Sequence, residues 1–471
     1  MTDSCYYNQN SFFDYFEENK LISCITGFTF TVIFIFIYIL KAYTFFDKRC
    51  IPRAVDPTAP FGNIKDVLFQ ETTFYVYLWK YYNKFKRKGF KYGGLYLFFK
   101  PSILVVDSIV MQKILTEQKC ITDGHRNYFP EVSTVVDLFT EDNLENFLLR
   151  YSSIKDTLLV DLDEKCASTV LHNFFMETTS SAFGFKISLE ALPAINALLN
   201  KKTSSGFKYY LGLVYPALFE RNKLVPEMQN LLKDIFEYRK KNDIRETDLI
   251  QSFIDLYNDG DYNLNDVILG IFDIIVDTII YSYSSLMFCL YELASNKDIQ
   301  KNLIQEIERF NKQNKSVGLK ALRQLSYLDA VVKETLRKYP PVPTIIKKCK
   351  ECYKIDGTNS ELPKGTFILH SVMGVHYDPL NYSDPGKFRP DRFLEAPNKV
   401  DMSNVYIPFG LDKQKEIGFR FTVLHVKLGI ISILSSYSVG MNSKSAMEFD
   451  NKKVPVYPKE PLPIVFESIL K

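Results

Sequence analysis

The most informative segment of this chain reads Pro408-Phe-Gly-Leu-Asp-Lys-Gln-Lys-Glu-Ile-Gly-Phe-Arg-Phe421 and continues to Lys427-Leu-Gly-Ile430. An aromatic residue, Phe409, and a glycine, Gly418, bracket a polar stretch that leads into a run long enough for a helix. Glu416 lies within the polar stretch, and the segment contains no cysteine. We therefore expect a loop followed by a helix, with a carboxylate just before the glycine.

Two further segments precede this one in the chain. The first, Val332-Lys-Glu-Thr-Leu-Arg-Lys-Tyr-Pro-Pro-Val-Pro343, ends a helix expected over residues 322–338, because proline cannot continue the hydrogen-bond ladder. Within it, Glu334 and Arg337 lie on one helix face, where such a pair is usually a solvated contact of little energy. The second is Phe388-Arg-Pro-Asp-Arg-Phe393. The order and spacing of all three segments carry more information than any one of them.

These segments resemble, in order, the E-x-x-R, P-E-R-F and F-x-x-G-x-R-x-C-x-G motifs of the cytochrome P450 family, and the resemblance covers roughly residues 60–465. Three shorter segments resemble its insect microsomal branch: Tyr291-Glu-Leu-Ala294, Asp298-Ile-Gln300 and Tyr353-Lys-Ile355. The resemblance implies a mainly α fold with a small β lobe and an N-terminal membrane anchor. It also implies heme-dependent oxidation of small apolar molecules, with O₂ and with electrons from a membrane-bound reductase.

The resemblance also assigns structural roles. Glu334, Arg337 and Arg392 would form a salt-bridged cluster behind the heme loop, and all three are present in this chain. A buried cluster of this kind adds little net stability, but losing one member leaves the others as unpaired charges.

Four residues stand at positions that bind heme in the family. Phe409 and Gly418 keep the family spacing, and Arg150 keeps the arginine of a W-x-x-x-R pair whose tryptophan is replaced by Asn146. Lys347 stands in the strand after the proline stop, where the family has an arginine for a heme propionate. Lysine keeps the charge at this position but not the forked geometry of a guanidinium.

The iron-ligating cysteine of the family is replaced by Glu416, which is therefore the candidate for the axial metal position. In the family the thiolate donates electron density that favours O–O cleavage, whereas a carboxylate is a harder and weaker donor. Gln414 replaces a second propionate arginine, and His425 falls about two and a half turns into the following helix, where we expect it to face protein.

A long apolar stretch, residues 267–294, predicts a central helix that is buried on most sides. Aligned to the family without gaps, its acid and threonine for proton delivery fall on Ile280 and Tyr281. Asp277 and Thr278 form an acid–alcohol pair about one turn earlier and are the candidates for this role. The alternative is that both are polar groups satisfied within the helix.

The N-terminal region predicts a membrane anchor. Residues 21–40 carry no charge and are long enough to cross a bilayer. We assign residues 1–20 to a lumenal tail, 41–62 to a proline-containing linker and 63–471 to the cytochrome P450-like domain. The basic residues that follow the span are Lys41, Lys48, Arg49 and Arg53. They predict that the domain faces the cytoplasm from the endoplasmic reticulum membrane. A cleaved signal peptide and a buried core helix are the alternatives.

The composition excludes several classes of protein. A hydrophobic content of 46% with 24% charged residues argues against disorder, and a net charge of +3 argues against nucleic-acid binding. Eight cysteines without a repeating spacing indicate a reducing compartment. Cys349 and Cys352 form a lone C-x-x-C, which we interpret as two free thiols in a surface loop.

Residues 94–99 and 102–106 predict two strands joined by a tight turn.

Three functional hypotheses follow. In the first, the chain is a catalytically impaired relative that binds an apolar small molecule or a partner. In the second, it is an active oxidoreductase that holds heme weakly or through Glu416. In the third, it is the product of a decaying or misread gene. The first is favoured because the iron ligand, a propionate arginine and the proton relay are lost together while the scaffold motifs remain.

Overall fold

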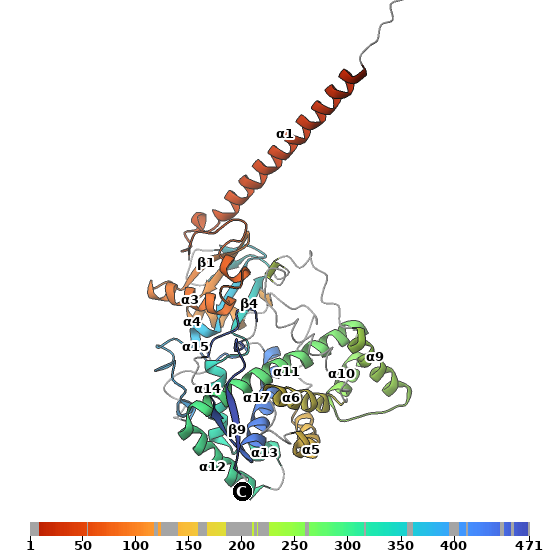
Figure 1. Ribbon diagram of the computed structural model, residues 1–471, viewed down its shortest axis with the longest axis vertical. Coiled ribbons are helices and arrows are strands. Elements are labelled where there is room, and N and C mark those ends of the chain that lie inside the picture. Colours follow the sequence, from red (N-terminus) through yellow and green to blue (C-terminus); the bar gives the residue numbers. More distant parts are fainter. Residues whose placement is uncertain are drawn as a thin grey trace, which may run out of the picture.

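The computed structural model describes residues 9–53, 55–116, 121–123, 140–158, 167–184, 210–211, 214, 226–259, 263–314, 317–355, 361–394, 405–410, 413–442, 447–453 and 456–469. Within these ranges the protein is mainly helical with small sheets, as the sequence predicted. Figure 1 shows a β-rich lobe beside a larger helical part, with one long helix leading away from the β lobe.

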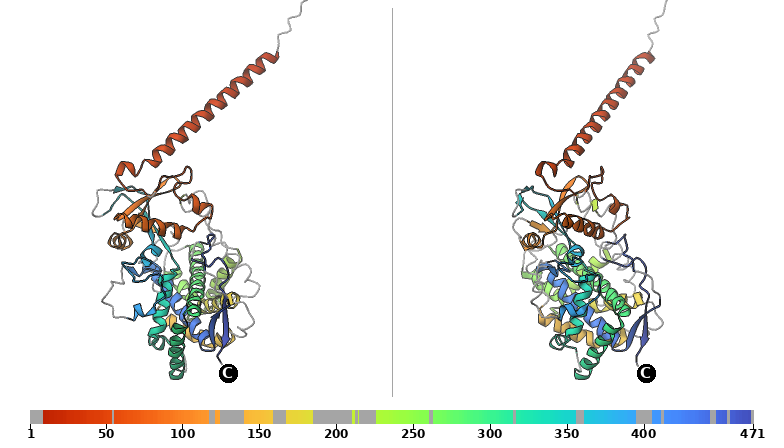
Figure 2. Two further views of the ribbon diagram at one scale, coloured as in Figure 1. Left: turned by 60° about the vertical axis from the view of Figure 1, so that its left-hand side comes forward. Right: turned by 90° about the vertical axis from the view of Figure 1, so that its left-hand side faces the viewer.

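That long helix is α1 (Gln9–Tyr43), which projects away from the rest of the chain in every view (Figures 1 and 2). Among the described residues the only stretch long and apolar enough to cross a membrane, Ile25–Arg49, begins in this helix, and none of its most apolar 18-residue window is buried. The helix begins inside the segment that we assigned to the N-terminal tail. Its exposed apolar surface has the length and composition of a membrane span.

The β lobe is built on a five-stranded sheet in the order β1-β2-β7-β4-β3. The strands are β1 (Tyr92–Leu97), β2 (Lys100–Val105), β7 (Phe367–Ser371), β4 (Thr344–Cys349) and β3 (Ile121–Asp123). The antiparallel pair β1–β2 confirms the predicted hairpin, shifted by one or two residues. Close packing explains the glycine at position 94, because a Cβ there would lie 2.7 Å from the Phe46 ring. Cys349 ends β4 and is buried while Cys352 is exposed, so the expectation of two surface thiols is wrong for Cys349.

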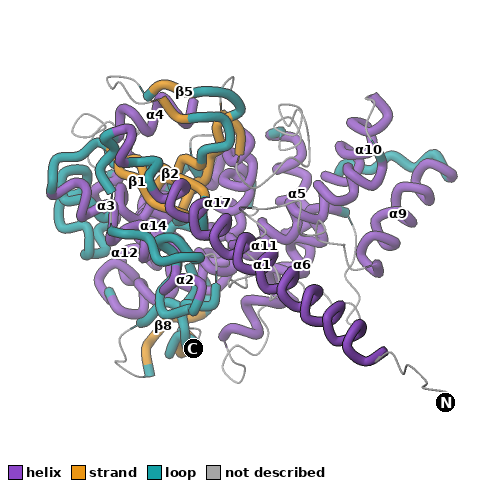
Figure 3. The backbone as a smooth tube through the Cα atoms, turned by 90° about the horizontal axis from the view of Figure 1, so that it is seen from above, coloured by secondary structure: helices purple, strands orange, loops and turns teal. Residues whose placement is uncertain are grey.

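The helical part is organised around α11 (Leu264–Ser295), which confirms the predicted central helix. It packs against α17 (Lys413–Leu434), α6 (Ala167–Phe183) and α14 (Ser326–Lys338). α14 ends at Lys338, directly before the predicted proline stop. The other helices of this part are α5 (Glu141–Leu158), α9 (Pro226–Lys241), α10 (Leu249–Asp259), α12 (Lys297–Gln313) and α13 (Leu319–Leu322). Seen from above, the strands gather on one side of the molecule and α9 and α10 lie on the other (Figure 3).

The remaining elements belong to one part or the other or lie between them. They are η1 (Asp47–Arg49), α2 (Lys65–Leu68), α3 (Phe74–Arg87), α4 (Ser108–Thr116), β5 (Tyr353–Lys354), β6 (Glu361–Leu362), α15 (Val372–His376), η4 (Pro390–Phe393), β8 (Tyr437–Met441) and β9 (Ile464–Ser468). Of these, α15 and η4 pack on α14 and bring distant segments of the chain to its C-terminal end. This junction positions the candidate site.

Candidate functional site

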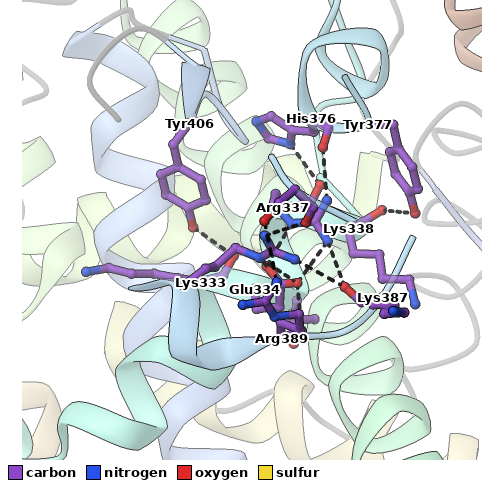
Figure 4. Close-up of polar contacts among 12 residues, drawn as sticks. Lys333, Glu334, Arg337, Lys338, His376, Tyr377, Lys387, Arg389 and Tyr406 are labelled. Carbon is purple, nitrogen blue, oxygen red and sulfur yellow. Dashed lines mark hydrogen bonds and ion pairs between the residues drawn. The ribbon is translucent and has the colours of Figure 1, made fainter. Parts of the chain in front are cut away.

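A buried ionic cluster lies at the C-terminal end of α14 (Figure 4). The Arg337 guanidinium donates to both carboxylate oxygens of Glu334, from Nε at 2.7 Å and from Nη2 at 2.9 Å, and both side chains are fully buried. The i,i+3 spacing on one helix face makes this fork possible. Arg392, on η4, approaches the same carboxylate with Nε 3.1 Å from Oε2. The structure therefore brings the three predicted residues together.

Backbone groups complete the coordination of the cluster. The amide of Arg389 donates to Glu334 Oε1 at 2.9 Å, and Arg337 Nη1 donates to the carbonyl of His376 at 2.9 Å. Burial lowers the pKa of Arg337, but hydrogen bonds to Glu334 more than offset this, and the net pKa is raised. Burial lowers the pKa of Arg392. Removing one partner would leave a buried charge without its counterion.

The loop that leads into α17 lies directly beside this cluster. The carbonyl of Pro408 accepts from the Val342 amide at 3.3 Å, which fixes the loop against the proline stop. Phe409 is buried, and its ring meets the ring of Tyr281 on α11 edge-on, with centroids 5.9 Å apart. Tyr281 is the residue on which the ungapped comparison places the family threonine, and that placement stays a prediction.

The candidate axial position lies on α17. This helix begins at Lys413, so Glu416 and Gly418 are in its first two turns rather than in a loop. Their side chains lie outside the described residues. We expected the helix to begin after Gly418, and it begins earlier. The reason is that no residue between Lys413 and Ile417 is a helix breaker.

The two other candidate cofactor residues lie on different elements. Arg150, on α5, donates from Nη1 to the Ser181 carbonyl at 3.2 Å, and the same atom is 3.7 Å from Asp248 Oδ2. Its Nη2 is 3.6 Å from Glu246. Carboxylates before α10 thus already compensate this guanidinium. Lys347 is a buried residue of β4, in register with Ile368 of β7.

The two candidate proton-relay residues lie in the middle of α11. Thr278 is buried, and Asp277 is half-buried and has an interaction partner. One turn later Ile280 belongs to the hydrophobic core, while Tyr281 is the residue that contacts the loop. On α11, Tyr281 is therefore the residue whose ring contacts Phe409 of the loop before α17. The assignment of Asp277 and Thr278 as the acid–alcohol pair stays a prediction.

His425 is enclosed by protein, as expected. Its imidazole is fully buried, with ring centroids 4.7 Å from Phe421, 5.3 Å from Phe175 and 5.4 Å from Phe147. Neither ring nitrogen has a hydrogen-bond partner among the residues that the structure describes. Burial lowers the pKa of His425 to about 3, so the ring is neutral.

The described residues do not fit a heme held in the family manner. The chain has no cysteine between residues 408 and 430, and Cys289 on α11 is a buried thiol whose pKa burial raises to about 12. The Arg150 guanidinium is already paired with two carboxylates, at 3.6 Å from Glu246 and 3.7 Å from Asp248. A flat macrocycle cannot be placed between Tyr281 and Phe409 unless one of these rings moves.

Sequence reasoning missed one feature of this site, the fully buried His376. Its ring bonds to residues 39 and 31 positions away in the sequence, so no local pattern indicates it.

The amino-acid sequence is similar to those of known proteins over most of its length. Residues 188–466, more than half of the chain, match the cytochrome P450 family. The chain is 25% identical to probable cytochrome P450 6d4 of Drosophila melanogaster, over 90% of this chain and 94% of the relative. It is 24% identical to cytochrome P450 6B7 of Helicoverpa armigera, over 91% and 95%, and 26% identical to cytochrome P450 6B5 of Papilio glaucus, over 88% and 97%.

Proposed function

Because this chain belongs to the cytochrome P450 family, whose members are heme monooxygenases, we propose that it keeps the family scaffold without thiolate-dependent oxygen activation. Its role is then to bind a small apolar molecule or a partner. The observation that carries this proposal is that residues 408–430 contain no cysteine, with Glu416 where the resemblance places the iron-ligating one. No rearrangement of neighbouring residues within 408–430 can supply a sulfur ligand, because the segment contains none.

The surroundings of the site support the same proposal. A carboxylate beneath an apolar macrocycle would need iron, a proton or a cation to offset its desolvation. The Arg150 guanidinium already contacts Ser181, Glu246 and Asp248, which makes it less available to a propionate. The Glu334–Arg337 pair, in contrast, is intact, so the scaffold is retained where the chemical positions are not.

A second candidate function is altered oxidative chemistry. The intact Glu334, Arg337 and Arg392 cluster favours it, because this cluster supports the same loop that holds heme in the family. In this alternative heme is bound weakly or through the Glu416 carboxylate, and peroxide rather than O₂ supplies the oxidant. Proteins of the family bind heme, which keeps this alternative open.

We also propose that the chain is anchored in the endoplasmic reticulum membrane with its main domain facing the cytoplasm. The apolar, unburied surface of α1 supports the anchor. The basic residues after the span support the orientation. In this proposal residues 1–20 are lumenal, 21–40 span the membrane, 41–62 form the linker and 63–471 the domain, and a membrane-bound reductase is a partner of the second candidate function.

Absorption spectroscopy of the full chain, expressed with an ample heme supply and purified in detergent, tests the proposal. We expect the wild-type protein to show no thiolate-type Soret band when reduced under carbon monoxide, and Glu416→Cys to gain one. Wild-type protein should still bind the fluorescent apolar probe 1-anilinonaphthalene-8-sulfonate in its folded state. A thiolate-type band in the wild type overturns the proposal. A Soret band at another position, lost in Glu416→Ala, supports the second function instead.

A further inference from the structure

His376, the last residue of α15, joins two parts of the site that are far apart in sequence. Its Nδ1 lies 2.8 Å from the carbonyl oxygen of Arg337, and its Nε2 accepts from the amide of Ile407 at 3.0 Å. The ring is fully buried. Figure 4 shows it beside Arg337 at the junction of the ionic cluster and the loop. One imidazole thus bridges the end of α14 and the loop that leads into α17.

The two partners determine the protonation state of the ring. A backbone amide only donates, so Nε2 must be an acceptor, and a carbonyl oxygen only accepts, so Nδ1 must carry the proton. The ring is therefore the neutral Nδ1–H tautomer. Burial and the nearby Arg337 charge lower the pKa of His376 to about 3, which keeps it neutral. A protonated ring would lose the hydrogen bond from Ile407.

Additional contacts make the bridge rigid. Arg337 returns a hydrogen bond from Nη1 to the His376 carbonyl, so these two residues are joined in both directions. The Tyr406 ring stacks on the imidazole at a centroid distance of 5.9 Å and an angle of 12°. The Tyr406 hydroxyl donates to the carbonyl of Lys333 on α14 at 3.2 Å. The loop is therefore docked on α14 directly by the Tyr406 side chain and indirectly by the bond from the Ile407 amide to His376.

We propose that His376 is a positioning residue, and that its Nε2 bond to the Ile407 amide sets the position of residues 405–410 relative to the buried ionic cluster. The cluster fixes Arg337, Arg337 fixes His376, and His376 fixes the loop. This coupling does not depend on what occupies position 416, so it goes beyond the function proposed above. Its direct consequence is local order in the loop rather than stability of the whole fold.

Conservative substitutions separate this role from simple space filling. The side-chain amide of glutamine reaches the position of Nε2 and can accept from Ile407, whereas that of asparagine reaches only the position of Nδ1. His376→Gln therefore keeps the bond that the proposal requires. His376→Asn keeps only the contact with the Arg337 carbonyl. His376→Leu removes both contacts but retains an apolar side chain of similar bulk.

Hydrogen exchange measured by mass spectrometry on the full chain in detergent tests the proposal. Amide exchange in the peptide covering residues 405–410 should accelerate about tenfold in His376→Leu and His376→Asn, the factor expected for one lost hydrogen bond. In His376→Gln it should stay within about threefold of wild type. The β1–β2 hairpin, residues 92–105, serves as the internal reference and should not change.

The result that overturns the proposal is equal exchange in the glutamine and asparagine variants, whether both are protected or both are fast. If the leucine variant does not fold, the comparison of the two amide variants still decides. A second readout uses ¹⁵N-histidine labelling, which is tractable because the chain has five histidines. One ring, assigned by its absence in His376→Gln, should show the Nδ1–H tautomer. The Nε2–H tautomer or a charged ring at this position rejects the assignment.

Discussion

Mild acid should destabilise this protein through two buried histidines. His376 and His425 are both fully buried, and burial lowers the pKa of each to about 3 from an ordinary value of 6.5. In the unfolded chain both rings take up a proton below pH 6.5, whereas in the folded protein neither does until about pH 3. The stabilisation from each neutral ring is therefore fully present above pH 6.5 and is lost as the pH falls toward 3.

The magnitude follows from this difference in proton uptake. At pH 5.5 the unfolded-state imidazole is about ten times more protonated than neutral, which favours the unfolded state by about 1.4 kcal/mol per histidine. Two histidines together give a loss of about 2.8 kcal/mol between pH 7.5 and 5.5. The lowered pKa of the Asp329 carboxyl does not contribute in this window, because its effect begins near the ordinary aspartate value of 3.8.

Urea titrations of the full chain in detergent, at constant ionic strength, measure this loss. His376→Gln and His425→Phe should each remove about half of the pH dependence between 7.5 and 5.5, and the double variant should remove most of it. The glutamine keeps the hydrogen bond to Ile407, and phenylalanine suits a cage of aromatic rings. A wild-type unfolding free energy that is flat across this range, or a double variant that keeps the full slope, refutes the reasoning.

Two further substitutions test the packing around the site. Arg337→Met should lower the free energy of unfolding by about 3–5 kcal/mol, because it leaves the fully buried Glu334 carboxylate without its bidentate partner. A loss below 1 kcal/mol in a denaturant titration would show that the pair is solvated. Gly374→Ala should cost about 1–3 kcal/mol, since a Cβ there would lie 2.5 Å from the Tyr82 ring. Gly386→Ala is its matched control, with open space around the new methyl group, and equal thermal midpoints for the two variants would contradict the packing argument.

Local signals in the sequence predicted much of the fold. The proline pair after Tyr339 ends α14 where expected, because a proline ring cannot continue a helix. The apolar run of α11 and the β1–β2 hairpin were also predictable, since both depend on residues that are close in sequence. The start of α17 was not, because the boundary between a loop and a helix depends on weak preferences that tertiary contacts override.

The sequence by itself determines which chemical groups are available. Residues 408–430 contain a carboxylate at position 416 and no thiol, and no arrangement of the backbone can change that. It also places Glu334 and Arg337 on one helix face, because a helix repeats every 3.6 residues. These conclusions require only the identity and spacing of neighbouring residues.

Only the tertiary structure decided which partners those groups meet. Arg150 matches a heme-binding position in sequence, yet its guanidinium is held by Ser181 and by carboxylates near α10. His376 matched no motif, yet its ring joins Arg337 to Ile407. The physical reason is that a side chain's charge and hydrogen-bonding capacity are local properties, whereas its partners come from segments that lie side by side only after the chain has folded.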